Sequence, residues 1–214
     1  MNSTVRLDKR DLILAKGAAV MTRRGYHGTG VQEIVQAAGI PKGSFYHYFG
    51  SKERFGEALL AQYLERYLAQ LDALLQPDDA GTPARARLMR YWSYWNVSQC
   101  GTAPADAAVD GCATEAAGAR CLIVKLSAEV ADMSEPMRLA LRRGTDDIVQ
   151  RIALCLQQCQ NEGAVPARAD TAALALTLYE LWLGASLLAK LRRDGTAFEH
   201  ALKSTEQLLD MAPA

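Results

Sequence analysis

The chain has 214 residues, half of them apolar and 22% charged, a composition typical of a soluble globular protein. It carries 24 basic and 24 acidic side chains, and this net charge of zero excludes a chain that binds nucleic acid through its overall charge. A chain of this length can bury a substantial core as one domain or as two small ones.

The first helix is predicted over residues 8–24, because apolar side chains recur there about once per turn, and Gly25 is expected to end it. A second helix follows and reaches Gly39. Its expected N-cap is Thr29, and Gln32 three residues later is the expected partner in a capping box.

A third, short helix is predicted over residues 42–49. The residue before Pro41 avoids the α region, which favours a turn there, and Pro41 can open the helix because its missing N–H is not needed at that position. Gly50 is expected to end this helix. Ser51 is expected to cap a long helix over residues 51–75, which would tie the N-terminal segment rigidly to the rest of the chain.

The rest of the chain is also predicted to be helical. Helices are expected over residues 85–99, 121–130, 134–162, 170–193 and 196–211, with a linker at residues 77–83. Residues 101–119 are rich in Ala, Gly and Asp without an apolar period, so they are interpreted as a loop or a weak helix. Strand alternation and internal repeats are not evident, and the predicted fold class is therefore all-α.

Positive charge is concentrated at the N-terminal end of the chain. Residues 1–55 contain nine Lys and Arg but four Asp and Glu, a net charge of +5, which leaves −5 on residues 56–214. A basic segment on an acidic body suits phosphate contact at one end only. Chance scatter of surface charge is the alternative.

The short helix over residues 42–49 has the character of a DNA-reading element. Phe45 and Phe49 lie four residues apart and are expected to pack inward, which leaves polar side chains and a glycine on the outer faces. Such side chains can donate to phosphates and base edges, and the start of the next helix adds a cation beside a helix N-terminus. The alternative is a helical corner with a solvated polar face. The candidate DNA-binding residues are Thr29, Lys42, Gly43, Ser44, Tyr46, His47 and Lys52.

The N-terminal quarter of the chain resembles the TetR family of one-component repressors. The residues that carry the resemblance are Arg10, Ile13-Leu14, Gly25-Tyr26, Thr29, the run from Ala38 to Phe49, and Ser51-Lys52-Glu53. The resemblance implies a TetR-like homodimer with a three-helix helix-turn-helix DNA-binding domain at residues 1–55. It implies an effector-sensing and dimerisation domain at residues 56–214, and a palindromic operator that is released when an effector arrives.

Residues 120–138 and 181–190 resemble the NemR-like branch of that family, which responds to electrophiles and oxidants through cysteine. The resemblance implies that Cys121 is the sensor cysteine. A sensor thiol needs nearby positive charge or a helix N-terminus, because the thiolate is the reactive form. Arg120 precedes Cys121, and Lys190 could meet it if the two helices pack together. The alternative is that Cys121 is a small core residue and that Lys190 extends to solvent.

Five cysteines without an apparent secretory signal indicate reduced thiols and a cytoplasmic protein. Cys100 and Cys112 flank the Ala- and Gly-rich stretch and are candidates for resolving thiols. Cys155 and Cys159 lie at i and i+4 on one predicted helix, where core packing is favoured over metal ligation because the three histidines give no ligand spacing. A metal or a cofactor is not expected.

A second hypothesis is a repressor that is induced by reversible binding of a small apolar or aromatic ligand. Its pocket could be lined by Tyr91, Trp92, Trp95 and Trp182, although these residues could equally be ordinary core. An enzyme is disfavoured, because the chain contains no Gly-x-Ser-x-Gly, phosphate-loop, His-Glu-x-x-His or Cys-x-x-Cys motif.

The apolar run over residues 172–189 is long enough to span a membrane, but Glu180 and the small residues favour a buried helix. The last two helices are expected to form the homodimer interface. The small residues Gly184, Ala185 and Ser186 are expected to let the helices approach closely. Apolar contact area is expected from Leu181, Leu187, Leu188 and Leu191. The expected partners are double-stranded operator DNA, an electrophile, oxidant or small-molecule inducer, and a second copy of the chain.

Overall fold

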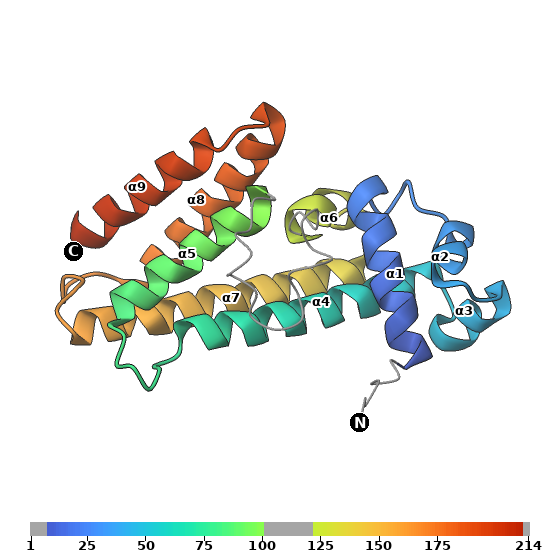
Figure 1. Ribbon diagram of the computed structural model, residues 1–214, viewed down its shortest axis with the longest axis horizontal. Helices are drawn as coiled ribbons and strands as arrows, with labels where there is room; N and C mark the ends of the chain where they lie inside the picture. The colour runs from blue at the N-terminus through green and yellow to red at the C-terminus, as the bar shows by residue number, and fades with distance from the viewer. Residues whose placement is uncertain (1–7, 101–121, 212–214) are drawn as a thin grey trace, which may run out of the picture. The chain divides into compact units, whose positions relative to one another are not determined.

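The computed structural model describes residues 8–100 and 122–211, and within these ranges it consists of nine α-helices and no strand. The helices are α1 (Lys9–Arg24), α2 (Val31–Ala38), α3 (Lys42–Phe49), α4 (Lys52–Leu75), α5 (Ala84–Cys100), α6 (Leu122–Val130), α7 (Glu135–Asn161), α8 (Thr171–Arg192) and α9 (Thr196–Met211) (Figure 1). The all-α prediction is thus confirmed for this part of the chain. The predicted loop or weak helix at residues 101–119 lies outside the described residues.

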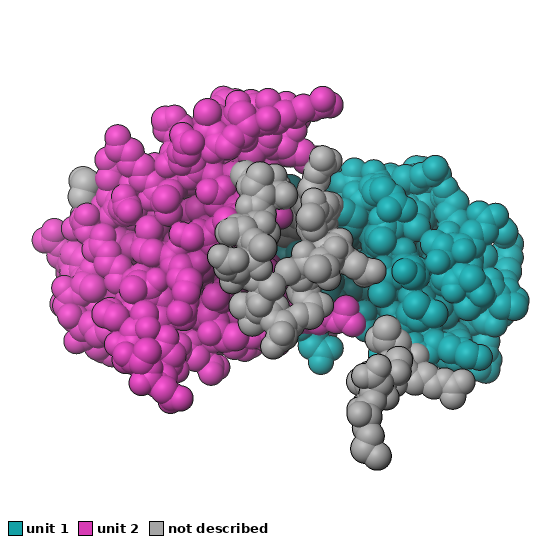
Figure 2. All heavy atoms as spheres, in the orientation of Figure 1, with its two compact units in different colours: residues 1–65, 121–142 teal, residues 66–120, 143–214 magenta. Residues whose placement is uncertain are grey.

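The chain divides into two compact units (Figure 2). One comprises residues 1–65 and 121–142, and the other comprises residues 66–120 and 143–214. Helices α4 and α7 each contribute residues to both units, so the division is not a single cut in the sequence. The predicted division at residue 55 concerns DNA binding and effector sensing, and it stays a prediction.

The first unit has an aromatic core beneath its three N-terminal helices. The ring centroid of Phe45 lies 5.4 Å from that of Phe49 and 5.2 Å from that of Phe55. Phe45 and Phe49 are buried, which confirms the inward packing predicted from their four-residue spacing. Helix α1 approaches this core so closely that a Cβ at Gly17 would lie 2.3 Å from Cζ of Phe55. Glycine at position 17 therefore permits the contact.

The start of α2 differs from the prediction. Gly30 rather than Thr29 is the N-cap, and its N–H donates to Oε2 of Glu33 at 2.9 Å. Thr29 is fully buried, and its hydroxyl donates to the carbonyl oxygen of Gly25 at 2.6 Å. The predicted capping box of Thr29 and Gln32 is wrong, because the end of α1 engages the threonine side chain and the helix begins one residue later.

The boundaries of α3 follow the predicted signals with one shift. Pro41 is extended, with φ −66° and ψ 147°, and lies at the N-cap instead of opening the helix. Gly50 ends α3 with φ 71°, a conformation that favours glycine. The predicted cap at Ser51 is confirmed, since its Oγ accepts the N–H of Arg54 at 3.1 Å.

In the second unit, buried tryptophans join α8 to its neighbours. The indole N–H of Trp182 donates to Oγ1 of Thr205 on α9, and that of Trp95 on α5 donates to Oγ of Ser186, each at 2.9 Å. Buried donors need such partners, so these bonds fix the orientation of the rings. The predicted cap of α8 is confirmed, because the Asp170 carboxylate accepts two backbone N–H groups at 3.0 Å.

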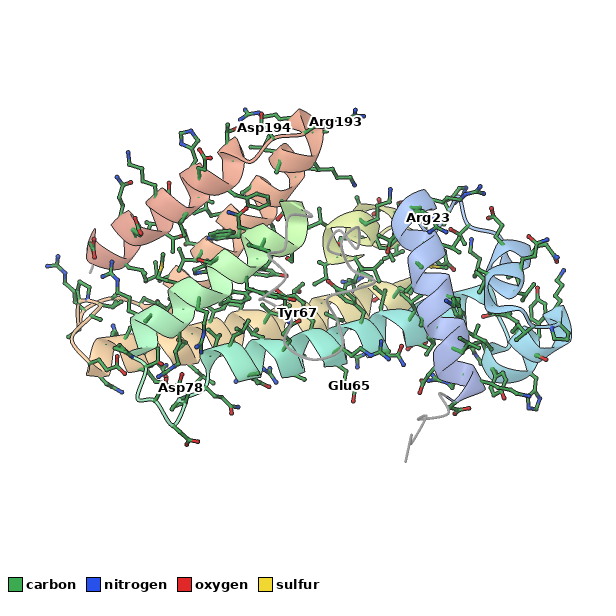
Figure 3. The ribbon with its side chains drawn as sticks, viewed as in Figure 1. Arg23, Glu65, Tyr67, Asp78, Arg193 and Asp194 are labelled. Atoms are coloured by element: carbon green, nitrogen blue, oxygen red, sulfur yellow. The ribbon has the colours of Figure 1, made fainter. Side chains whose placement is uncertain are left out.

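The turn between α8 and α9 is a second capped junction, with Arg193 and Asp194 labelled in Figure 3. Arg193 has φ 59° and ends α8 in the left-handed conformation. Asp194 accepts hydrogen bonds from the N–H of Thr196 at 3.1 Å and from its hydroxyl at 2.7 Å. These bonds hold the pKa of Asp194 below its ordinary value, the hydroxyl contributing most.

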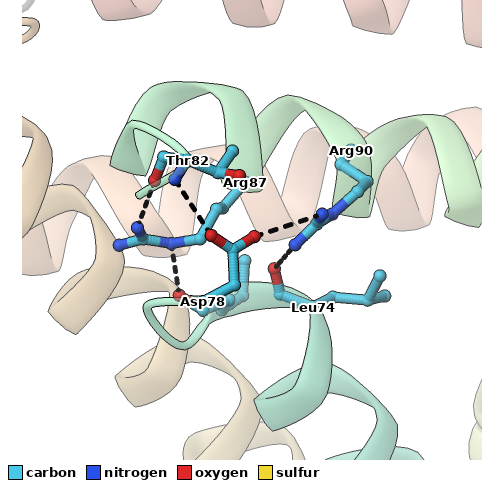
Figure 4. A network of polar contacts seen from close by, with 6 residues as sticks. Leu74, Asp78, Thr82, Arg87 and Arg90 are labelled. Atoms are coloured by element: carbon cyan, nitrogen blue, oxygen red, sulfur yellow. Dashed lines mark hydrogen bonds and ion pairs between the residues drawn. The ribbon is translucent and has the colours of Figure 1, made fainter. Parts of the chain in front are cut away.

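The linker between α4 and α5 is organised by arginines (Figure 4). The buried guanidinium of Arg87 donates to the carbonyl oxygens of Leu75, at 3.0 Å, and of Thr82. Asp78 accepts the Thr82 N–H at 2.9 Å and lies 3.7 Å from the guanidinium of Arg90. The predicted linker at residues 77–83 is thus a fixed turn, because Arg87 bonds the carbonyl oxygen of Thr82 and Asp78 bonds its N–H.

Candidate nucleic-acid interface and effector region

Helices α2 and α3 are joined by a three-residue turn. Gly39 has φ 64° and ψ 35°, the left-handed conformation in which glycine commonly ends a helix. The N–H of Ile40 donates to the carbonyl oxygen of Val35 at 3.0 Å, and Pro41 then directs the chain into α3. Two short helices with such a link form a helix-turn-helix, whose second helix is the one that enters a DNA major groove.

The two faces of α3 differ in chemistry. Phe45 and Phe49 point into the core. The exposed residues are Lys42, Gly43, Tyr46, His47 and Tyr48, while Ser44 is half-buried. A Cβ built on Gly43 would meet nothing within 4 Å, so no described neighbour requires glycine there. The outer face combines hydrogen-bond donors, aromatic surface and room for close approach, which are features of surfaces that contact phosphates and base edges.

Lys52 is the first residue of α4 and is half-buried. Its Nζ lies 4.4 Å from the centroid of the Tyr26 ring, within cation–π range. Burial lowers the pKa of Lys52 from its ordinary value, and the carboxylate of Glu129 opposes this change. Burial likewise raises the pKa of Tyr26, and the charge of Glu53 adds to it. The cation is therefore held in a defined environment beside the helix N-terminus.

Thr29 differs from the other predicted DNA-binding residues, which lie on α3 and at the first position of α4. Its side chain is fully buried and bonded to the carbonyl oxygen of Gly25. In the structure it stabilises the connection between α1 and α2. A contact between Thr29 and DNA stays a prediction.

A groove of about 400 Å³ lies beside the C-terminal end of α3. Its lining residues come from α1, α3, α4 and the turn between α3 and α4, and are Arg10, Tyr46, His47, Tyr48, Phe49, Gly50, Arg54, Glu57 and Ala58. Arg10 and Arg54 were not predicted to be functional residues, because Arg10 is remote from α3 in the sequence and only the fold brings the two together. The positive charge of residues 1–55 included both arginines, and the TetR resemblance included Arg10 but assigned it no role.

The corner between α6 and α7, residues 129–137, contacts the N-terminal helices within the first unit. The carboxylate of Glu129 accepts the backbone N–H of His27 at 3.0 Å. The hydroxyl of Ser134 donates to Oε1 of Glu53 at 2.6 Å. These residues are 102 and 81 positions apart in the sequence, and no local pattern predicts such pairs.

Met137 completes the same junction with an apolar contact. It is fully buried. A Cβ built on Gly56 of α4 would lie 2.5 Å from Sδ of Met137 and 2.9 Å from Cε2 of Tyr26. The α6–α7 corner thus packs on the N-terminal helices without room for a side chain at position 56.

The four aromatic residues predicted to line a ligand pocket lie together in the second unit. Trp92 stacks on Trp182, with ring centroids 4.9 Å apart and planes at 13°, and Trp95 lies 5.9 Å from Trp92. Each is at most 3% exposed, so they form a packed core. The hydroxyl of Tyr91 is 2.8 Å from that of Tyr67, which Figure 3 labels.

One polar atom in this cluster has no partner among the described residues. The indole N–H of Trp92 is buried and makes no hydrogen bond there. A buried donor without an acceptor costs about 1–3 kcal/mol. The aromatic cluster therefore contains a donor that a bound acceptor would satisfy.

The predicted sensor cysteine and its neighbour, Cys121 and Arg120, lie outside the described residues, as does Cys112. The side chain of Cys100 is also outside them. Lys190 is exposed in the last turn of α8. The sensor role of Cys121 and its pairing with Lys190 stay predictions.

Cys155 and Cys159 are buried in the second unit, which confirms core packing for this pair. The thiol of Cys155 lies 3.5 Å from the carbonyl oxygen of Ala84. Its hydrogen bond with Cys159 and its burial raise the pKa of Cys155 above the ordinary value. A thiol held protonated in the core is a poor nucleophile.

Helix α8 has an exposed apolar face as well as a buried one. The exposed leucines, each at least 41% accessible, are Leu176, Leu187, Leu188 and Leu191. Gly184 is also exposed, and a Cβ there would meet nothing within 4 Å. Ala185 and Ser186 are buried within the chain, so of the three small residues predicted at a dimer interface only Gly184 is exposed. Extended apolar surface of this kind marks an interaction site.

By length and composition, α8 is also the one helix of the described chain that could cross a membrane. Of the apolar window that meets this test, 39% is buried within the protein. The described contacts of Trp182 and Ser186 account for its buried side.

These features define the class of protein: an all-α DNA-binding regulator with an N-terminal helix-turn-helix and a C-terminal helical region. Residues 13–59 match the bacterial regulatory proteins of the tetR family, and residues 102–205 match the tetracyclin repressor-like C-terminal domain. The chain therefore belongs to the TetR family of transcriptional regulators, as the resemblance at residues 10–53 predicted.

Individual relatives match over nearly the whole chain. The HTH-type transcriptional repressor NemR of Escherichia coli strain K12 is 34% identical over 209 residues, 98% of each protein. The crystal structure of E. coli NemR in its reduced form matches with a TM-score of 0.81 and 34% identity, covering 97% of this chain and 99% of that one. The HTH-type transcriptional repressor DhaR of Mycobacterium sp. strain GP1 is 31% identical over 207 residues, 93% of this chain and 95% of DhaR.

Proposed function

We propose that this chain is a transcriptional repressor that binds a palindromic double-stranded DNA operator as a two-fold homodimer in the cytoplasm. The observation that carries the proposal is the helix-turn-helix, whose second helix buries its phenylalanines and exposes its polar residues. Two relatives, NemR and DhaR, are described as transcriptional repressors, which supports repression as the output. Those relatives are regulators, so we propose no enzymatic turnover.

In this proposal, the residues of α3 have separate roles on DNA. Lys42 and Ser44 donate to base edges near the start of the helix, and Gly43 lets the backbone approach closely. Tyr46 and His47 donate further along the same face. Lys52 neutralises a phosphate beside the N-terminus of α4.

The second copy covers the exposed apolar face of α8. A palindromic operator presents two equal half-sites, and a two-fold dimer presents two equal copies of α3. Burial of leucines such as Leu187 and Leu191 between the copies removes apolar surface that a soluble monomer rarely exposes. This occupant accounts for the apolar length of α8 without a membrane.

Release from DNA follows covalent modification of Cys121, whose thiolate Arg120 and Lys190 stabilise. With an activated alkene, a sulfur–carbon bond forms, the alkene electron pair shifts to the adjacent carbon, and that carbon takes a proton from water. With a peroxide, the thiolate is oxidised to a sulfenic acid and the peroxide is reduced, its second oxygen leaving as hydroxide. Support comes from the resemblance at residues 120–138 and from the likeness to NemR.

The signal reaches DNA through α6. This helix begins at Leu122, directly after the proposed sensor, and its far end carries Glu129. Displacement of α6 would withdraw Glu129 from the N–H of His27 and would disturb the bond between Ser134 and Glu53. The two copies of α3 would then lose the spacing that the operator requires.

Two measurements test this function. In vitro selection from random duplexes with the full chain should recover an inverted repeat, and recovery of no preferred sequence would contradict operator binding. Intact-mass analysis after treatment with N-ethylmaleimide should map the first adduct to Cys121. A first adduct at any other cysteine would contradict the sensor assignment.

A second candidate inducer is a small apolar or aromatic ligand with a hydrogen-bond acceptor. The buried indole N–H of Trp92, which has no partner among the described residues, favours it. An acceptor on the ligand would take this donor while the ligand packs against Trp182. Release of the operator by such a ligand from a variant without any of the five cysteines would support this mode.

A further inference from the structure

The groove beside α3 contains two arginine side chains that form no ion pair within the described part of the chain. Among the described ion pairs, none involves Arg10 or Arg54. Glu57 is the one carboxylate that lines the groove. The groove therefore has a net charge of +1 with His47 neutral, and both guanidinium groups keep their donors for an external acceptor.

The guanidinium of Arg10 is positioned by an aromatic ring instead of an acid. Its Cζ lies 5.6 Å from the centroid of Phe49. Phe49 is itself fixed, since its ring lies 5.4 Å from that of Phe45 and 4.9 Å from that of Phe55. Stacking on a rigid ring orders the arginine while leaving its planar set of N–H donors available, a geometry that suits phosphate.

Arg54 belongs to the first turn of α4, and its position is fixed locally. Its backbone N–H donates to Oγ of Ser51, and its side-chain atoms pass within 4 Å of a Cβ built on Gly50. Lys52 lies two residues earlier, which on an α-helix is about 200° around the axis. Lys52 and Arg54 therefore point to different sides of the helix that follows α3.

We propose that this groove is a second phosphate-binding site, in which Arg10 and Arg54 hold the DNA backbone on a different side of α4 from Lys52. The inference rests on the proposed function and names the contacts by which the same surface positions α3. The last residues of α3, from Tyr46 to Phe49, form one wall of the groove together with Gly50. A phosphate bound there is consequently next to the helix that reads the bases.

The other wall residues fit the same ligand. The hydroxyl of Tyr48 and the ring N–H of His47 can donate to phosphate oxygens. Glu57 opposes an anion, so the site gains from a ligand that carries repeated negative charge and is held elsewhere along α3. A DNA strand meets both conditions, whereas an isolated phosphate ion meets neither.

The test measures the salt dependence of binding with the full-length chain. The probe is a fluorescein-labelled duplex recovered by in vitro selection. Binding is followed by anisotropy between about 0.05 and 0.3 M KCl, a range wide enough to define the slope of log K against log salt. Each phosphate contact contributes about 0.9 to the slope of log K against log salt, so loss of one contact per half-site lowers the slope by about 1.8 per dimer. The affinity at 0.1 M salt then falls about 60-fold.

We expect this change in Arg10→Gln and in Arg54→Gln. Arg54→Lys should restore the slope, because it keeps the charge, and Glu57→Gln should raise the affinity by removing the opposing carboxylate. Lys203→Gln, at an exposed position of α9, is the matched control and should leave the slope unchanged. Circular dichroism melting curves identify any variant that is unfolded. If a glutamine variant is unfolded, the salt slope of Arg54→Lys decides the test.

Three outcomes separate the possibilities. If the wild-type chain selects no duplex, the proposed function fails. If the wild-type chain binds and both glutamine variants keep its salt slope, the groove assignment alone is overturned. Calorimetric titration with inorganic phosphate at constant ionic strength should show no saturable binding. If phosphate does bind saturably, and Arg54→Gln abolishes that binding but leaves the salt slope for DNA unchanged, the groove is a free-anion site and the DNA assignment is overturned.

Discussion

Ser134 is the residue at which removal of one hydroxyl would most directly weaken the α6–α7 corner. Its buried side chain donates to Glu53 at 2.6 Å and accepts the N–H of Met137 at 3.5 Å, just before α7 begins. Ser134→Ala loses both bonds. A hydrogen bond to a charged group contributes about 1.5–3 kcal/mol, and a helix cap about 1 kcal/mol. Because the carboxylate of Glu53 is exposed and regains water, we expect a total cost of about 2 kcal/mol.

Hydrogen exchange detects this change locally. The amide of His27 donates to Glu129 of the same corner, so its exchange reports the opening of the contact. A cost of about 2 kcal/mol corresponds to about 30-fold faster exchange. Ser134→Thr keeps the hydroxyl and should remain within about threefold of wild type, an allowance of about 0.6 kcal/mol. Unchanged exchange at His27 in Ser134→Ala would refute the view that this corner holds the N-terminal helices.

Three further substitutions have defined outcomes. Gly17→Ala places a Cβ 2.3 Å from a core ring, so its free energy of unfolding in urea should fall by about 1–3 kcal/mol. A Cβ at Gly43 meets nothing within 4 Å, so Gly43→Ala should weaken only operator binding. Equal stability of the two variants would contradict this. Thr205→Val leaves a buried indole N–H without its acceptor and should cost about 1–3 kcal/mol, a loss that Thr205→Ser should not show. The backbone N–H of Thr82 is the chief cause of the lowered pKa of Asp78. The contribution of Asp78 to stability is therefore present above the pKa of the unfolded state, about 4, and is lost as the pH falls through the lower pKa of the folded state. Asp78→Asn should therefore flatten the stability–pH curve below about pH 4, and a curve parallel to wild type there would argue against it.

Local rules predicted much of the DNA-reading element. The spacing of Phe45 and Phe49 fixes which face of α3 is buried, because side chains four residues apart share one side of a helix. Ser51 and Asp170 cap helices by accepting backbone N–H groups that lie within three residues of each. These features depend on short sequence distances, and the structure confirms them.

Tertiary contacts explain what the sequence could not provide. Thr29 has the chemistry of an N-cap, but its hydroxyl bonds the carbonyl group of Gly25 four residues earlier, and the sequence alone does not decide between these two local partners. Arg10 joins the groove beside α3 only through the folding of α1 onto Phe49. The tryptophans of α5 and α8 are residue types that occur both in packed cores and in ligand pockets, so the sequence does not distinguish the two and only the packing does.

Release of the operator by a thiol-reactive electrophile tests the central claim most directly. The full-length chain is bound to its selected duplex, N-ethylmaleimide is added, and the bound fraction is followed by anisotropy in wild type and in Cys121→Ser. We expect the wild-type chain to leave the duplex and Cys121→Ser to stay bound with its initial affinity. Equal release of both proteins, or release of neither, would contradict a repressor switched through Cys121.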